Sequence, residues 1–161
     1  MDVVVFAVGN PSRGDDAIGP RLMAELEAAA RPGIRLVDDF QLQVEHALDL
    51  DGAALALFID AGTGTPAPFT FAEIEPRASR AVSSHALDPE AVLQVFRDVR
   101  QTAPPPAFVL CVRGESFELG APLSEAAERH LAAAMQRLAD CLTRPEAARW
   151  RQLAGKPTLT P

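Results

Sequence analysis

Four side chains of this sequence could do chemistry: Asp16, Asp38, Asp60 and His85. Carboxylates and a neutral imidazole suit a borderline transition metal such as zinc or nickel, and so small a set leaves coordination positions open for water or for a partner's ligands. Covalent catalysis has no candidate, because no serine sits in a nucleophile elbow, no His-Glu-x-x-His pair occurs and neither cysteine lies in a predicted site loop. The alternative to a metal site is that these residues are helix caps and surface charges.

Apolar runs place Asp38 and Asp60 directly after predicted strands, and Asp16 in the loop that follows the first strand. A continuous apolar run that ends in turn residues is typical of a parallel strand covered on both faces. A run that alternates apolar and polar residues instead predicts a half-exposed edge strand. Parallel strands are predicted over residues 3–8, 34–37, 53–59 and 107–112, and an edge strand antiparallel to them over residues 69–74.

Segments with helical periodicity separate these strands. The alternation predicts a three-layer α/β/α sandwich with about five mostly parallel strands and one antiparallel edge strand. Right-handed crossovers place successive loops along one edge of the sheet. We therefore expect Asp16, Asp38 and Asp60 to lie at that edge, and the approach of His85 to them depends on how residues 76–84 fold back.

The length predicts a single domain with a sizeable core. A chain of 161 residues can bury roughly two-thirds of the surface that it exposes when unfolded. The domain is predicted over residues 1–145. Beyond Pro145 the composition turns polar, so residues 146–161 are predicted to form a C-terminal tail.

The stretch from Gly9 to Asp16 turns the first strand into the first helix. Glycine, asparagine and proline are turn formers, and Asp15 or Asp16 can cap the helix that follows. One aspartate suffices as a cap, which leaves the other at the mouth of the sheet, where open α/β folds usually bind ligands. The alternative is that both are ordinary helix-start residues. The stretch lacks the Gly-Lys-Ser/Thr ending of a phosphate-binding loop and the three-glycine spacing of a dinucleotide fingerprint.

A short helix is predicted over residues 41–50. Helical spacing turns Val44, Ala47 and Leu48 inward and leaves His46 on the solvated face. We assign no role to His46.

Composition excludes several classes of protein. A formal net charge of −7 and a single lysine argue against a nucleic-acid surface, because phosphate contacts need clustered positive charge. No apolar run approaches the length of a membrane span, and the amino terminus has no signal-peptide pattern. The two cysteines form neither a disulfide framework nor a metal-ligand spacing. We expect a cytoplasmic monomer that binds neither nucleic acid nor membrane.

Residues 9–19 form the most distinctive motif, Gly-Asn-Pro-Ser-Arg-Gly-Asp-Asp-Ala-Ile-Gly. Asp38, Asp60 and the Ser-His-Ala-Leu stretch at 84–87 add weaker matches. Together they resemble the maturation proteases of nickel-iron hydrogenases, whose opening signature is Gly-Asn-x-x-x-x-Asp-Asp/Glu-x-x-Gly. Many members have glycines and a threonine after the second strand, where this chain has Asp-Phe-Gln at 39–41. This difference indicates another substrate subgroup.

The resemblance implies a phosphorylase/hydrolase-like fold and an endopeptidase that removes the carboxyl-terminal extension of a nickel-iron hydrogenase large-subunit precursor. It implies that Asp16, Asp60 and His85 contact nickel and that Asp38 takes part in activity. The substrate then supplies the nickel, and no permanently bound cofactor is expected. A site with few ligands of its own would discriminate loaded from empty precursor.

Two alternatives from other classes remain open. A receiver domain of signalling also uses an acidic pair near the first strand and an aspartate that ends the third. Its chemistry needs a lysine near the end of the last strand, where this chain has Val112 and Arg113. A flavodoxin-like binding module would be favoured if the purified protein carried flavin colour.

Overall fold

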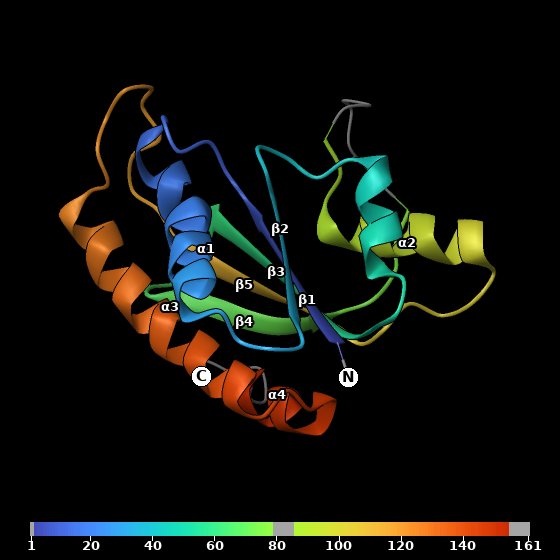
Figure 1. The fold of residues 1–161 in the computed structure, drawn as a ribbon. Coiled ribbons are helices and arrows are strands. Elements are labelled where there is room, and N and C mark those ends of the chain that lie inside the picture. The colour runs from blue at the N-terminus through green and yellow to red at the C-terminus, as the bar shows by residue number, and fades with distance from the viewer. Residues whose placement is uncertain (1, 79–85, 155–161) are drawn as a thin grey trace, which may run out of the picture.

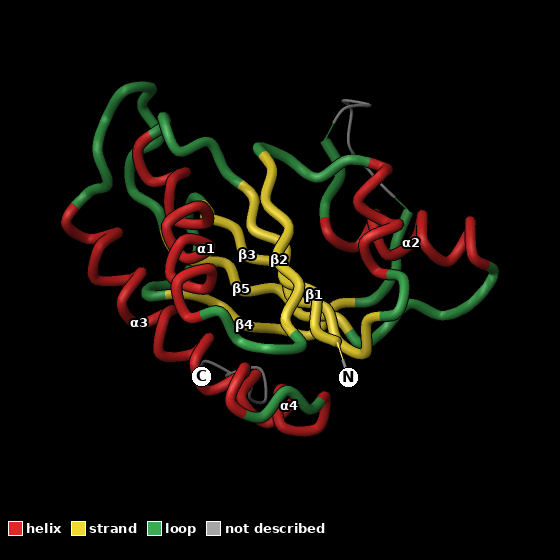
Figure 2. Tube along the Cα trace, viewed as in Figure 1, coloured by secondary structure: helices red, strands yellow, loops and turns green. Residues whose placement is uncertain are grey.

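The computed structural model describes residues 2–78 and 86–154. Its centre is a five-stranded sheet with the strand order β2-β1-β3-β5-β4 (Figure 1, Figure 2). The strands are β1 (Asp2–Val8), β2 (Ile34–Asp39), β3 (Ala53–Gly62), β4 (Phe69–Ile74) and β5 (Ala107–Arg113). The α-helices are α1 (Ile18–Ala29), α2 (Pro89–Arg100), α3 (Glu125–Thr143) and α4 (Ala147–Ala154), and two 3₁₀ helices are η1 (Gly14–Ala17) and η2 (Val44–Leu50).

The sheet is parallel except at one edge, as the sequence predicts. β1 pairs in parallel with β2 and β3, and β3 pairs in parallel with β5. β4 pairs antiparallel with β5 and forms one edge of the sheet. The carboxyl ends of β1, β2 and β3 therefore lie side by side at the edge where the three aspartates were predicted.

Helices cover both faces of the sheet (Figure 1). The odd-numbered residues of β1 pack with α1, α3 and α4, and the even-numbered residues pack with η2 and α2. Both sets are buried, which explains why this strand is a continuous apolar run. This arrangement confirms the predicted three-layer α/β/α sandwich.

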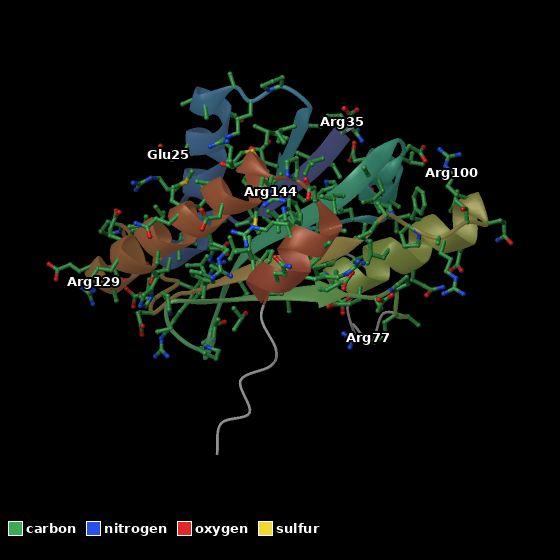
Figure 3. The ribbon with its side chains drawn as sticks, turned by 90° about the horizontal axis from the view of Figure 1, so that it is seen from below. Glu25, Arg35, Arg77, Arg100, Arg129 and Arg144 are labelled. Atoms are coloured by element: carbon green, nitrogen blue, oxygen red, sulfur yellow. The ribbon has the colours of Figure 1, made fainter. Side chains whose placement is uncertain are left out.

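Charged side chains lie on the outer surfaces of the helices. Arg100 and Arg129 project outward from α2 and α3 (Figure 3). Among the described helices, none is long and apolar enough to span a membrane.

The predicted C-terminal tail begins later than residue 146. Residues 147–154 form α4, and the Trp150 side chain is fully buried. The Trp150 Nε1–H donates to the Cys141 carbonyl oxygen at 2.8 Å, and the indole ring packs edge-on against Phe71 and Phe108. Ala147, Leu153 and Ala154 pack against the same core beside Trp150, so the packed part of the chain extends to residue 154.

Candidate active site

A glycine turn carries the chain from β1 into η1. Gly9 has φ +148°, and a Cβ there would collide with the Asp16 carbonyl oxygen. The Asn10 N–H donates to Asp16 Oδ2 at 2.7 Å, and the Asn10 side chain accepts the Ser12 N–H at 2.9 Å. At Gly19 a Cβ would collide with the Val8 carbonyl oxygen, so α1 packs directly on β1. The glycines of the motif are therefore needed where backbone segments touch.

Neither aspartate of the motif caps α1, which corrects the capping prediction. The cap position of α1 is Ala17, without a side-chain cap. Asp15 is instead fully buried, and its carboxylate accepts four hydrogen bonds from the loop between β5 and α3. The donors are the Glu115 N–H at 2.6 Å, the Ser116 N–H at 3.1 Å, and the Ser124 N–H and hydroxyl, each at 2.8 Å.

These contacts hold Asp15 in its charged form. Burial by itself raises the pKa of Asp15, but the hydrogen bonds from Ser124, Glu115 and Ser116 outweigh it and bring the pKa below its ordinary value. The donors lie about 100 residues away in the sequence, so no local pattern could indicate them. Asp15 thus ties the motif to a remote loop and leaves Asp16 free for the site.

Asp60 lies near the carboxyl end of β3, where it is half-buried. Burial, with a smaller contribution from the negative charge of Asp16, raises the pKa of Asp60 to about 6, although its carboxylate accepts the Ala61 N–H at 2.8 Å. The two carboxylates are therefore close enough to repel each other. A carboxyl group with such a raised pKa in a cavity is typical of a functional site.

Asp16 and Asp60 line one cavity of about 440 Å³. Its lining includes Phe6 and Phe58, whose rings stack with centroids 4.7 Å apart. Residues 40–42 after β2 and residues 86–89 before and at the start of α2 complete the lining. The structure thus joins two of the predicted site residues in a space that would hold a few side chains of a partner.

Asp38 lines a neighbouring cavity of about 260 Å³, together with Gly9, Pro11, Pro20, Asp39 and Phe40. Asp38 is exposed and pairs in register with Ala7, which faces α1. Its side chain therefore belongs to the sheet face opposite that of Asp60. Phe40 lines both cavities and separates them.

His85 lies outside the described residues, so the predicted three-ligand set of Asp16, Asp60 and His85 stays a prediction. Within residues 2–78 and 86–154, no three His, Cys, Asp or Glu side chains are grouped so that they could hold a metal ion.

Cys111 is a neighbour of the site that the sequence did not indicate. It pairs in register with Asp60 across β3 and β5, and its Sγ lies 3.3 Å from the Thr65 hydroxyl. Burial, followed by the charge of Asp60, raises the pKa of this thiol despite the Thr65 contact. Because the thiolate is the nucleophilic form, Cys111 is not an activated nucleophile.

His46 is buried, which corrects its predicted place on the solvated face. Only 5% of its surface is exposed, whereas Val44 and Leu48, predicted to point inward, are more than half exposed. The segment is a 3₁₀ helix that begins at Val44, and the His46 Nδ1 accepts the Gln43 N–H at 2.8 Å. This bond holds the imidazole toward the sheet. The prediction assumed α-helical spacing, which was right for Ala47, buried at 2% exposure, and wrong for Val44, His46 and Leu48.

No family model and no curated protein matches this chain. Several solved structures do match along most of its length. The hydrogenase maturating endopeptidase HybD from E. coli has 22% identity and a TM-score of 0.75, with 90% of this chain and 94% of that chain covered. A NiFe hydrogenase maturation protease, HycI, from Thermococcus kodakarensis has 20% identity and a TM-score of 0.68, with 89% and 93% covered.

A third match is the hydrogenase 2 maturation peptidase from a Thaumarchaeota archaeon. It has 23% identity and a TM-score of 0.64, with 89% of this chain and 99% of that chain covered. The similarity spans nearly the whole of each protein, and at these identities it bears on the fold. This chain therefore has the fold of the hydrogenase maturation endopeptidases.

Proposed function

We propose that this protein is an endopeptidase that removes the carboxyl-terminal extension of a nickel-loaded nickel-iron hydrogenase large-subunit precursor. The observation that carries the proposal is the pair Asp16 and Asp60, which line one cavity at the carboxyl edge of the sheet. Structural neighbours named as hydrogenase maturation endopeptidases support the same activity.

In this proposal nickel belongs to the substrate, and the protein recognises it through Asp16, Asp60 and His85. The raised pKa of Asp60 shows that its charge is poorly compensated in the protein alone. A cation that enters the cavity compensates both carboxylates, so a loaded precursor gains binding energy that an empty one lacks. Asp38 acts from the neighbouring cavity, where the precursor passes Phe40.

The topology argues against the two alternative functions. Receiver and flavodoxin-like domains have the strand order 2-1-3-4-5 in doubly wound sheets. This sheet has the order β2-β1-β3-β5-β4 with β4 antiparallel. The two arrangements agree in the first three strands of the order and differ in the last two.

The test is a cleavage assay with a large-subunit precursor prepared with and without inserted nickel. We expect the protein to shorten only the loaded precursor, and serine- and cysteine-directed inhibitors to leave cleavage unchanged. Asp16→Asn should reduce cleavage strongly, because the variant loses a charge that faces the metal. Asp98→Asn is the matched control, since Asp98 is exposed on α2 and lines neither cavity.

Two results would contradict the proposal. Equal cleavage of empty and loaded precursor would remove the role of nickel. Normal cleavage by Asp16→Asn would remove Asp16 from the site.

A further inference from the structure

The His46 imidazole is buried with each ring nitrogen directed at a different end of one short segment. Nδ1 accepts the Gln43 N–H at 2.8 Å, and Nε2 lies 3.4 Å from Asp39 Oδ2. Because Nδ1 is an acceptor, the neutral ring carries its proton on Nε2, where it faces the Asp39 carboxylate. The ring edge packs against Phe6, with centroids 6.2 Å apart and an interplanar angle of 88°.

The segment between these contacts, residues 39–43, is called the wall here: its residues 40–42 line the larger cavity, and Asp39 and Phe40 line the smaller one. Phe40 lines both of them and is 67% exposed. The Asp39 carboxylate accepts the Phe40 N–H at 2.7 Å through Oδ1, and the Asp39 carbonyl oxygen accepts the Gly9 N–H at 3.2 Å. His46 therefore contacts the same carboxylate that fixes the backbone of Phe40.

The far end of the segment is tied to the residues just before α2. Leu42 forms an isolated antiparallel bridge with Leu87, and the Leu87 N–H donates to the Leu42 carbonyl oxygen at 3.0 Å. Both ends of the wall are thus held, whereas its middle presents an exposed aromatic ring to the cavities. An exposed apolar side chain that is held by its backbone is suited to contact a partner.

We propose that His46 is a positioning residue that holds the wall at residues 39–43, and with it Phe40, in the conformation that binds the precursor. This inference rests on the proposed function for its substrate. His46 itself does not line either cavity. It acts through the Asp39 carboxylate, which leaves the Phe40 ring ordered before the precursor arrives and lowers the entropy cost of binding.

Three substitutions separate the two contacts of the ring. His46→Gln can place an amide N–H near the position of Nε2, so it keeps a donor toward Asp39. His46→Asn can place an oxygen near the position of Nδ1, so it keeps the acceptor for Gln43 but does not reach Asp39. His46→Phe keeps the packing on Phe6 and removes both polar contacts. His130→Asn, on α3, is the control for loss of a partly buried histidine.

In precursor cleavage, we expect His46→Phe and His46→Asn to raise KM about tenfold with kcat within about twofold, because the contact with the Asp39 carboxylate is lost before the chemical step. His46→Gln should restore KM to within about threefold of wild type, and His130→Asn should leave it unchanged. Loss of kcat with unchanged KM would overturn the proposal, as would equal KM values for His46→Gln and His46→Phe.

A second measurement does not depend on cleavage. Nitrogen chemical shifts of His46 should show the proton on Nε2, and the amide resonances of Phe40 and Gln41 should move in His46→Phe and return toward wild type in His46→Gln. If the wild-type protein cuts no precursor, the proposed function fails while this readout still decides the role of His46. A proton on Nδ1, or amide changes spread evenly over the sheet, would refute the positioning role.

Discussion

Replacing Asp15 should destabilise the protein strongly, although Asp15 lines neither cavity. Its fully buried carboxylate accepts four hydrogen bonds from Glu115, Ser116 and Ser124. A buried donor left without a partner costs about 1–3 kcal/mol. Water can reach part of this loop, because none of the three donor residues is itself fully buried. We therefore take the lower value for each bond, which gives about 4 kcal/mol for Asp15→Ala.

Asp15→Asn should cost less, about 2 kcal/mol. Its oxygen can take the place of Oδ2, which accepts three of the four hydrogen bonds. Its amide group then points two hydrogens at the Ser124 N–H, which loses its acceptor. The matched control is Asp16→Asn, since the described contacts of the Asp16 side chain include one hydrogen bond, from Asn10. That variant should change the free energy of unfolding by less than about 0.5 kcal/mol.

Urea unfolding measures these differences as shifts of the midpoint at a constant slope. For a chain of this length, about 4 kcal/mol corresponds to a melting temperature lower by roughly 8–16 °C. Two results would refute the reasoning: a cost below about 1 kcal/mol for Asp15→Ala, or equal costs for Asp15→Asn and Asp16→Asn. Either would mean that the carboxylate does not hold the remote loop.

The same contacts predict a pH dependence. The pKa of Asp15 is lower in the folded protein than in the unfolded chain, so its stabilisation is present above the unfolded pKa of about 3.9 and is lost as the pH falls through the folded pKa. The difference in stability between wild type and Asp15→Asn should therefore shrink below about pH 4. A constant difference down to pH 2 would contradict the assignment of these hydrogen bonds to the charged form.

Two further predictions concern Asp60 and Trp150. The pKa of Asp60 is raised to about 6, so ionisation of this carboxyl destabilises the folded protein progressively as the pH rises from about 4 to 6, and fully above that. Asp60→Asn should stabilise the metal-free protein by up to about 3 kcal/mol at pH 8, with the gain falling as the pH drops from 6 to 4, and it should abolish cleavage. The check is the free energy of unfolding of wild type and Asp60→Asn measured against pH, and a stabilisation by Asp60→Asn that grows toward low pH would contradict the prediction. Trp150→Ala should lower the free energy of unfolding by about 3–5 kcal/mol, because removal of a fully buried indole leaves a cavity. An unchanged melting temperature would mean that residues 147–154 do not contribute to the packed domain.

The sequence by itself determined the layered architecture of this protein. The apolar runs at residues 3–8 and 53–59 are short and end in turn residues, which is typical of buried parallel strands. Both strands lie inside the sheet rather than at its edges. The alternation at residues 69–74 likewise identified the antiparallel edge strand. Such patterns are local, because burial on one face or on two faces repeats along a strand with a fixed period. The edge of the sheet at which Asp16, Asp38 and Asp60 lie follows from the same alternation.

The tertiary structure decided which side chain does what at that edge. Asp15 and Asp16 are adjacent and look alike in the sequence, but they have different roles. Four donors from the loop between β5 and α3 surround Asp15, whereas Asp16 lines the same cavity as Asp60. His46 faces inward in a segment that forms a 3₁₀ helix rather than the α-helix that the prediction assumed, and its ring accepts the Gln43 N–H. Trp150 is fully buried and makes residues 147–154 part of the packed domain. For Asp15 and Trp150 the deciding partners lie far away in the sequence, and only folding brings them within contact distance. For His46 the partner is local, but the apolar pattern does not indicate the helix type.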